Sequence, residues 1–368
     1  MGQQRDDSIG ADDTRLRGDA SLLTLGEGRT PLIRSRFIGP HGGLPELYFK
    51  LETVNPTGSY KDRFAAAAIN AMIRDGATRV IGSSSGNAGA ALAAYSAAAG
   101  FDCEIAVVMD APESKLKQMQ AYGARLTKID GFGNDADVTQ RTMEFLRQLG
   151  GLPGAALQIT AYRYCPVGMA GVEAISHELV EQASVAGRRL QHVFVCAGGG
   201  GLGLAVARGF ASAVQRQALD RSPQIHCVQP AGNDTIAGAL RGGESTARAC
   251  RSTTAISGLQ VANVIDGDDL IAACRTSGGT GFLVTDQRVY ELQRMLARHE
   301  GIYCEPAAAV GLAGALQAVD EGRVDRDATV ACLITGAGFK DQASIDRMVA
   351  DQECPLLTLE QFQSKSRD

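Results

Sequence analysis

The feature that most constrains the fold of this chain is a repeated alternation of short apolar runs with longer helical segments. From Glu46 onward, each β-branched or apolar run is followed by a glycine-rich or polar turn and then by an amphipathic or alanine-rich segment. This order predicts an α/β fold in which helices flank a mostly parallel sheet. The predicted strands are Glu46–Leu51, Arg79–Gly82, Cys103–Met109, Arg125–Ile129, Ala156–Ile159, His192–Cys196, Gln224–Val228, Phe282–Val284 and Ala328–Ile334. The predicted helices are Asp62–Arg74, Asn87–Ala99, Glu113–Tyr122, Asp135–Gln148, Gly168–Gln182, Leu202–Val214, Asp286–His299 and Ala307–Val319.

Four consecutive predicted strands, from Arg79 to Ile159, form a block of their own. We expect this block to be a smaller mobile domain, residues 78–160, inserted in a larger domain made of residues 21–77 and 161–352. Between Gly232 and Asp268 the chain is rich in Gly, Thr, Ser and Arg with little periodicity, which predicts a long loop of the kind that often lines sites.

Composition narrows the classes of function. The net charge is -5, from 36 basic and 41 acidic residues, with no basic block, so we expect a small-molecule substrate and no nucleic-acid partner. No apolar stretch reaches the roughly 20 residues that span a bilayer, so no membrane partner is expected. Residues 1–20 lack the apolar core of a secretory signal and predict a flexible tail. We expect residues 353–368 to be a C-terminal tail. Nine cysteines without C-x-x-C spacing indicate no metal site and a reducing, cytoplasmic location.

The first segment with chemical meaning is Asn55–Arg63, which places Lys61 at the start of a predicted helix. A helix N-terminus disfavours a cation, so the pKa of the amine is lowered and its neutral, nucleophilic form becomes easier to reach. A single lysine in such a turn is usually just solvent-exposed. Its meaning therefore depends on the other segments.

The second segment, Gly82–Gly89, joins a strand to a helix and combines three serines with Asn87. Hydroxyls and backbone N–H groups at a helix start form an anion site suited to a carboxylate, although a plain helix cap has the same composition. The pattern Gly82-x-Ser84-x-Gly86 also matches a serine-hydrolase nucleophile turn. That function needs a histidine on a loop, and the downstream histidines fall inside predicted elements: His177, His192, His226 and His299.

The third segment is a strand followed by the glycines 198–201 and Leu202. Successive glycines let backbone N–H groups converge on a phosphate at the start of the next helix. The spacing also fits a dinucleotide-binding turn, which expects an acidic residue at the end of the next strand. That strand is followed by Gln229 and Pro230, which disfavours the alternative of a nicotinamide-dependent oxidoreductase.

The fourth segment, Cys332–Asp341, ends the last predicted strand with Thr335 and two glycines. Ligands of open parallel sheets lie beyond the carboxyl ends of the strands, which is where Thr335 falls. The chain has neither a Gly-Lys-Ser/Thr phosphate loop nor a His-Glu-x-x-His pair, so nucleotide hydrolysis and zinc proteolysis find no support.

In this order the segments resemble the fold type II, tryptophan-synthase-β-like, pyridoxal-phosphate enzymes. The resemblance extends from about Gly26 to Asp341. Within that group, Gly26–Leu32, Asn55–Arg63, Glu305-Pro306-Ala307 and the final Thr335–Asp341 are similar to the threonine synthase branch. The runs Ser85-Gly-Asn-Ala-Gly and Gly-Gly-Gly-Gly-Leu resemble the serine/threonine dehydratases instead.

The resemblance implies two open, mostly parallel sheets, a larger domain that binds pyridoxal 5'-phosphate, and a homodimer. It implies that Lys61 carries the cofactor as a Schiff base and moves the α-proton. Asn87 would bond the phenolic oxygen of the ring, and Thr335 its nitrogen. The phosphate would be bound by Gly198, Gly199, Gly200, Gly201 and Leu202, and the substrate carboxylate by Ser84, Ser85 and Gly86.

The implied activity is that of a lyase or synthase that acts on an amino acid by β- or γ-elimination or replacement. A neutral hydroxyl at the ring nitrogen makes the cofactor a milder electron sink, which suits elimination better than transamination. The alternative within the group is a serine/threonine dehydratase, an ammonia-lyase.

The segment Thr160–Gly171 departs from the threonine synthase branch. Arg163 is displaced, and the Gln-Lys-Thr that helps to bind phosphohomoserine in that branch is absent. Because these phosphate-binding groups are missing, we expect phosphohomoserine not to be the best substrate. Lys115 and Lys117, which follow Pro112 on a neighbouring helix, are the cations that could compensate. The segment also adds side chains that we expect to make this wall of the site more apolar: Tyr162, Tyr164, Cys165 and Pro166.

Overall fold

The computed structural model describes residues 22–109, 111, 113–261 and 264–365, which form two sheets. The first sheet contains β1 (Leu32–Arg34), β2 (Leu47–Leu51), β7 (His192–Cys196), β8 (Gln224–Pro230), β9 (Gly281–Val284) and β10 (Val330–Ile334). The second contains β3 (Arg79–Ser83), β4 (Asp102–Val107), β5 (Arg125–Lys128) and β6 (Ala155–Gln158). Their orders are β1-β2-β10-β7-β8-β9 and β5-β4-β3-β6, and every pair is parallel except β1 with β2.

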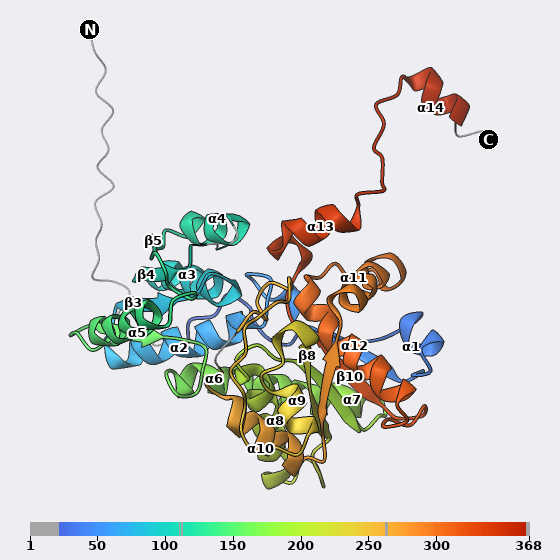
Figure 1. The fold of residues 1–368 in the computed structure, drawn as a ribbon, viewed down its shortest axis with the longest axis horizontal. Coiled ribbons are helices and arrows are strands. Elements are labelled where there is room, and N and C mark those ends of the chain that lie inside the picture. The colour runs from blue at the N-terminus through green and yellow to red at the C-terminus, as the bar shows by residue number, and fades with distance from the viewer. Residues whose placement is uncertain (1–21, 110, 112, 262–263, 366–368) are drawn as a thin grey trace.

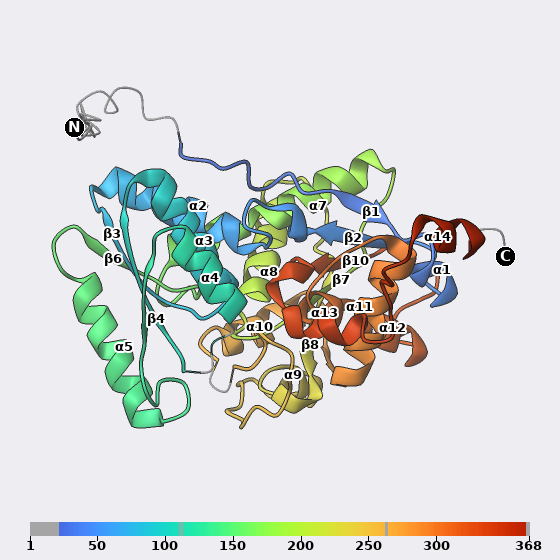
Figure 2. The same cartoon turned by 90° about the horizontal axis from the view of Figure 1, so that it is seen from above.

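Each sheet is covered by its own set of helices, so the molecule consists of two units. In Figure 2 the four-stranded sheet with α3, α4 and α5 lies at the left, and the six-stranded sheet with α8, α11 and α12 lies at the right. The helices are α1 (Ile38–His41), α2 (Lys61–Asp75), α3 (Asn87–Ala99), α4 (Glu113–Ala121), α5 (Ala136–Gly150), α6 (Pro166–Val172), α7 (Ala174–Val185), α8 (Gly201–Gln215), α9 (Ala237–Arg241), α10 (Gly267–Thr276), α11 (Asp286–Glu300), α12 (Pro306–Asp320), α13 (Gln342–Met348) and α14 (Leu359–Lys365). Short 3-10 turns are η1 (Glu52–Val54), η2 (Ala231–Asn233) and η3 (Gly338–Lys340).

This architecture confirms the predicted α/β fold, with all nine predicted strands present within two residues of their expected bounds. The prediction of one helix over Gly168–Gln182 is wrong, because α6 ends and α7 begins around Glu173. The break lets α6 pack on α2 while α7 packs on α8. The approach to α2 is close, since a Cβ at Gly171 would lie 2.5 Å from the Arg63 carbonyl oxygen. The sequence also failed to predict β1, α10 and α13.

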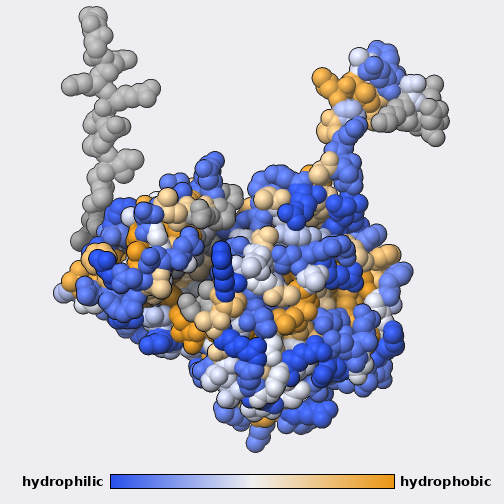
Figure 3. Space-filling view, in the orientation of Figure 1, coloured by the Kyte–Doolittle hydropathy of each residue, from blue (hydrophilic) through white to orange (hydrophobic). Residues whose placement is uncertain are grey.

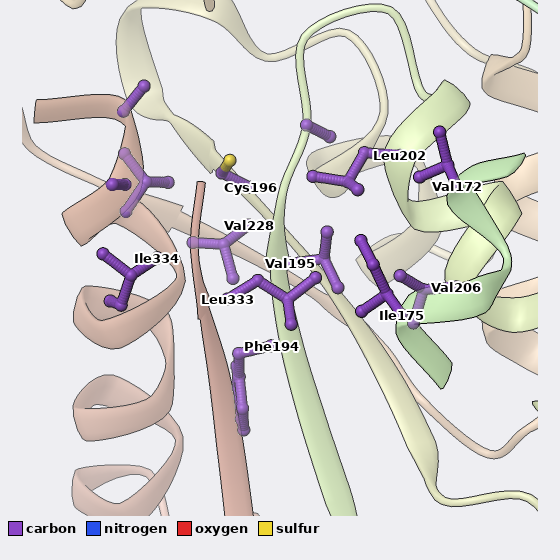
Figure 4. Packing of buried hydrophobic residues seen from close by; sticks show 14 of the residues in the cluster. Val172, Ile175, Phe194, Val195, Cys196, Leu202, Val206, Val228, Leu333 and Ile334 are labelled. Carbon is purple, nitrogen blue, oxygen red and sulfur yellow. The ribbon is translucent and has the colours of Figure 1, made fainter. Parts of the chain in front are cut away.

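The core lies around the two central strands of the first sheet. Strands β7 and β10 are buried along their whole length, which is why, apart from His192 at the start of β7, they consist of apolar residues in place of an alternating pattern. Figure 4 shows Phe194 and Val195 of β7 beside Leu333 of β10, with Leu202 and Val206 of α8 on the far side. The Leu202 side chain therefore belongs to the core, so only its backbone is available to a ligand.

The C-terminal residues leave the body of the molecule. After α13 the chain runs outward and ends in α14, as Figures 1 and 3 show. Leu356, Leu359 and Phe362 are 100%, 66% and 60% exposed on this arm. The predicted tail at residues 353–368 thus includes a helix, whereas the predicted tail at residues 1–20 lies outside the described residues. Of the helices in the described ranges, none has the length and apolar character to cross a membrane.

Candidate active site

A cavity of about 1750 Å³ opens between the two sheets, at the carboxyl ends of their strands. Ser83 ends β3, Cys196 ends β7 and Thr335 follows β10, and all three line this cavity. Parallel sheets bind ligands at this edge because strand ends and helix starts meet there. The cavity brings together every site residue expected from the sequence: Lys61, Ser84, Ser85, Gly86, Asn87, Gly198, Gly199, Gly200, Gly201, Leu202 and Thr335.

Lys61 begins helix α2 and presents its amine to the cavity. The preceding turn is held in place because the backbone N–H of Tyr60 donates to the Thr335 carbonyl oxygen at 3.1 Å. Burial lowers the pKa of the Lys61 amine to about 8, against the opposing effects of Cys196, Asp266 and Glu305. Within the described ranges, neither a carboxylate nor a hydrogen-bond acceptor pairs with this amine. At pH 7 roughly a tenth of it is then neutral, enough for a nucleophile.

The glycine run forms a cradle at the start of α8. Gly200 caps this helix with a φ of 95°, a conformation that favours glycine. A Cβ at Gly200 would lie 2.9 Å from the Asp266 carbonyl oxygen, whereas Gly199 faces open space. The free N–H groups of a helix start and its positive dipole end suit a phosphate.

The serine-rich turn precedes α3 on the opposite wall. The Ser84 hydroxyl accepts a hydrogen bond from the Gly86 backbone at 3.2 Å, and the Ser85 hydroxyl accepts one from the Val108 backbone at 3.1 Å. Each hydroxyl therefore keeps its own proton for another acceptor. Gly86 has nothing within 4 Å of the place where a Cβ would stand, so its surroundings leave room for a carboxylate.

The carboxylate of Glu305 was not among the expected site groups, and Lys115 was expected only as a compensating cation. The Glu305 carboxylate accepts a hydrogen bond from the Asn87 side-chain nitrogen at 2.7 Å, and the Lys115 ammonium lies 3.5 Å from the other Glu305 oxygen. Both side chains are nearly fully buried. The sequence Glu305-Pro306 indicated that Glu305 stands at a helix start. The neighbouring residues do not indicate the direction of its carboxylate. Lys117, the other cation expected to compensate, is 77% exposed at the cavity rim.

The expectation that Tyr162, Tyr164, Cys165 and Pro166 form an apolar wall is wrong. The cavity lining takes only Thr160 from the start of this segment. Tyr162 turns away because its hydroxyl donates to Glu173 and its ring lies under the Arg208 guanidinium, 3.9 Å from the ring centroid. The backbone N–H of Tyr162 donates to the Asp266 carboxylate at 3.0 Å, which holds the segment outward.

The structure also bears on the two alternatives from other classes. No histidine lines the cavity among the residues described, so Ser84 has no base there and a hydrolase is not supported. Gln229, where ribose recognition would be expected, is fully buried and bonds Thr235 and the backbone of Ile236 and Ala237. Its amide therefore holds the loop after β8.

The cavity fits pyridoxal phosphate on its own chemistry. It offers an unpaired amine, an N–H cradle and a Thr335 hydroxyl whose neighbour is the Cys196 thiol at 3.8 Å. Two buried atoms, Asn87 Oδ1 and Glu305 Oε2, lack a hydrogen-bond partner among the described residues. The family model described as "Pyridoxal-phosphate dependent enzyme" matches residues 23–336. The chain belongs to this family. The match confirms the predicted cofactor and the prediction of a pyridoxal-phosphate-dependent enzyme.

Curated relatives extend the comparison. The threonine synthase of Methanocaldococcus jannaschii is 31% identical over 332 residues, which cover 89% of this chain and 78% of that protein. The threonine synthase of Synechocystis sp. is 33% identical over 325 residues, covering 87% of this chain and 79% of that protein. The predicted resemblance to threonine synthases is thereby confirmed.

Solved structures confirm the fold. Maize serine racemase superposes with a TM-score of 0.72 at 23% identity, covering 88% of this chain and 92% of that one. Diaminopropionate ammonia lyase from Escherichia coli superposes with a TM-score of 0.74 at 21% identity, covering 89% of each chain. At these identities the likeness concerns the fold alone.

Proposed function

We propose that this chain is a threonine synthase-like lyase or synthase that eliminates or replaces a β- or γ-substituent of an amino acid. The observation that carries this proposal is the unpaired Lys61 amine, which lies between the glycine cradle and the serine-rich turn. The proposal includes a homodimer in the cytoplasm. It also assigns residues 78–160 to a smaller domain that moves against residues 21–77 and 161–352, with residues 1–20 and 353–368 as tails.

In this proposal the chain's own residues divide the work. The N–H groups of residues 198–202 hold the cofactor phosphate, and Asn87 and Thr335 hold the ring. Ser84, Ser85 and Gly86 hold the substrate carboxylate. When bound, the cofactor supplies an electron sink for the charge that forms at the substrate α-carbon. Lys61 binds the cofactor and, once released by the substrate, takes the α-proton at its Nζ and passes a proton on to the departing group or to the product.

Serine/threonine dehydratase activity is the second candidate. The observation that favours it is the run of four glycines, which this chain shares with the dehydratase pattern, together with the two serine hydroxyls that are free to donate. An ammonia-lyase needs only water as its second substrate, so it makes no demand for a site that binds a leaving phosphate.

A first experiment tests the cofactor assignment. The purified protein should show the visible absorbance of a protein-bound pyridoxal phosphate, and borohydride reduction followed by peptide mapping should find the label on Lys61. A label on Lys50, Lys115 or Lys340 would show that the assignment is wrong. The absence of any such absorbance after incubation with the cofactor would contradict the proposed function.

A second experiment tests the substrate. A substrate phosphate carries close to two charges and needs several fixed donors, ideally a bidentate Arg. Arg163 is exposed and does not line the cavity. Besides Lys61, the cations in the lining are Lys115, which is buried and pairs with Glu305, and three exposed side chains, Lys117, Arg251 and Arg347. We therefore expect phosphohomoserine to have a lower kcat/KM than another member of a panel with O-acetylserine, O-phosphoserine, O-acetylhomoserine, serine and threonine. The opposite ranking, with threonine as product, would make the enzyme an ordinary threonine synthase.

A further inference from the structure

Glu305 stands immediately before helix α12, yet its carboxylate caps no backbone N–H of that helix. The side chain turns into the cavity instead and is 4% exposed. Its backbone N–H donates to the Gly336 carbonyl oxygen at 3.0 Å, and a Cβ at residue 336 would lie 2.3 Å from Glu305 Oε1. The carboxylate is thus packed against the backbone that follows the strand carrying Thr335.

The two oxygens of this carboxylate have different partners. Oε1 accepts a hydrogen bond from Asn87 Nδ2 at 2.7 Å. Oε2 has no hydrogen-bond partner among the residues described, and the Lys115 ammonium is 3.5 Å away, too far for a good hydrogen bond. Lys115 donates to the Ser257 hydroxyl at 3.0 Å. Of these two polar contacts of the Glu305 carboxylate, the hydrogen bond to Asn87 is therefore the shorter.

This bond limits how the Asn87 amide can be oriented. The amide nitrogen carries two donors, and only this nitrogen can face a carboxylate, because the amide oxygen would meet a like charge. The last torsion of an asparagine side chain is otherwise broad, so a free amide would occupy several orientations. With one N–H on Glu305, the second N–H points in a fixed direction.

We propose that Glu305 is a positioning residue, which fixes the Asn87 amide so that its second N–H is directed at the ring oxygen of the cofactor. The inference rests on the proposed function, in which Asn87 bonds that oxygen. The bond also joins α3, on the four-stranded unit, to the six-stranded unit at the cofactor. A charge-assisted hydrogen bond is about twice as strong as a neutral one, so an ionised carboxylate suits this role.

The test is a double-mutant cycle read by cofactor affinity. The apoproteins of wild type, Glu305→Ala, Asn87→Ala and the double variant are titrated with pyridoxal phosphate, followed by absorbance. We expect each single change to weaken binding about tenfold, since a hydrogen bond to a charged group or a buried donor is lost. The double variant should bind the cofactor with the affinity of the single variant that binds it less tightly, because the two residues act as one unit.

Two further variants sharpen the cycle. Glu113 also lines the cavity, but it lies at the rim and is 83% exposed, so Glu113→Ala should bind the cofactor like wild type. Glu305→Gln keeps an acceptor oxygen without the charge, so its loss should be smaller than that of Glu305→Ala and should vanish in the Asn87→Ala background. If circular dichroism shows that Glu305→Ala does not fold, this second cycle, with Glu305→Gln, tests the positioning role of Glu305 instead.

Losses that add in the double variants, or wild-type affinity in Glu305→Ala, would overturn the role of Glu305. A merely structural role would produce such additivity. Wild-type titration and labelling of Lys61 test the proposed function independently. Failure of both in the wild type refutes the proposed function, whereas normal capture on Lys61 with additive variants refutes only the positioning of Asn87.

Discussion

Two clusters of buried charge meet on the first turn of helix α2 and differ in how completely each charge is paired. On one side, Arg63 donates two hydrogen bonds to Glu52 and two to Glu178, at 2.6 to 2.8 Å. The Lys50 ammonium donates to Glu178, Gln182 and the Thr30 carbonyl oxygen, which accounts for all three of its donors. We call Lys50, Glu52, Arg63 and Glu178 the paired cluster.

On the other side, the cavity lining includes Lys61, Lys115 and Glu305, which we call the cavity cluster. Burial lowers the pKa of the Lys61 amine to about 8, and it does the same for Lys340, a buried neighbour that does not line the cavity. Lys340 donates to Gln118 at 2.7 Å, while Lys61 has no hydrogen-bond partner among the described residues and one oxygen of Glu305 is likewise unpaired. Unpaired buried groups cost stability, which a bound ligand then recovers.

The two clusters differ in role: the buried charges of the paired cluster stabilise the fold, whereas the groups of the cavity cluster that lack partners are available to a ligand. In the paired cluster, burial alone would raise the pKa of Glu178, but hydrogen bonds and charges from Arg63 and Lys50 lower it to about 2. In the cavity cluster the charges of Cys196, Asp266 and Glu305 oppose the effect of burial on Lys61 only in part, and its pKa stays lowered. A reactive amine and a structural guanidinium can thus lie two residues apart on one helix.

The largest effect expected is on turnover. Lys61→Ala should abolish it, because this amine both binds the cofactor and moves the α-proton. The circular dichroism spectrum should stay that of the wild type, since Lys61 is outside the paired cluster. Lys117→Ala, an exposed lysine at the cavity rim, is the control and should keep its activity. Substantial turnover in Lys61→Ala would remove Lys61 from the reaction.

The second effect is on stability and concerns the paired cluster. Arg63→Met leaves Glu52 and Glu178 buried without their partner, so the free energy of unfolding should fall by about 3–5 kcal/mol in urea denaturation. Arg125→Met is the matched control, since this arginine pairs with Glu104 at the surface and is 60% exposed. Its loss should stay below about 1 kcal/mol. Equal losses in the two variants would show that the buried paired cluster contributes no more to stability than a surface ion pair.

The paired cluster also predicts a pH dependence. Because the pKa of Glu178 is lower in the folded protein than its ordinary 4.5, its contribution to stability is complete above pH 4.5. That contribution should be lost as the pH falls from 4.5 toward 2. Denaturation curves of the wild type and Glu178→Gln across this range should therefore converge on acidification, and a constant gap between them would contradict the assignment.

A smaller effect of opposite sign is expected in the cavity cluster. Lys61→Met should raise the melting temperature of the apoprotein at pH 7 by about 2 °C, because it removes an unpaired buried amine. The folded pKa of about 8 lies below the ordinary 10.5, so the cost of burying Lys61 is complete below pH 8 and disappears as the pH rises to 10.5. The gain should shrink accordingly at pH 10. A Lys61→Met apoprotein that melts below the wild type at pH 7 would contradict this account.

The smallest effect concerns the ring nitrogen of the cofactor. Thr335→Val should weaken cofactor binding by about 1 kcal/mol, as measured by titration of the apoprotein, because one neutral hydrogen bond is lost. Thr329→Val, at a buried threonine that does not line the cavity, should leave the affinity unchanged. An unaltered affinity in Thr335→Val would place the nitrogen against another group.

The sequence was sufficient for the parts of the site that depend on local backbone chemistry. Lys61 at a helix start, the glycine run between β7 and α8, and Thr335 after β10 were all predictable. Each position follows from residues a few places away: a turn, a run without side chains, the end of an apolar strand. The parallel order of the elements then brings such strand ends to one edge.

Only the tertiary structure determines where a side chain points when its partners lie far away in the sequence. Lys115 and Lys117 are two residues apart on α4 and both line the cavity, yet Lys115 is 3% exposed beside Glu305 whereas Lys117 is 77% exposed at the rim. Tyr162 lies beside Glu173 and Arg208, outside the cavity that its segment borders. Glu305 meets Asn87 across 218 residues of chain. Contacts between such distant segments depend on how the two sheet units pack together. A local sequence pattern does not predict that packing.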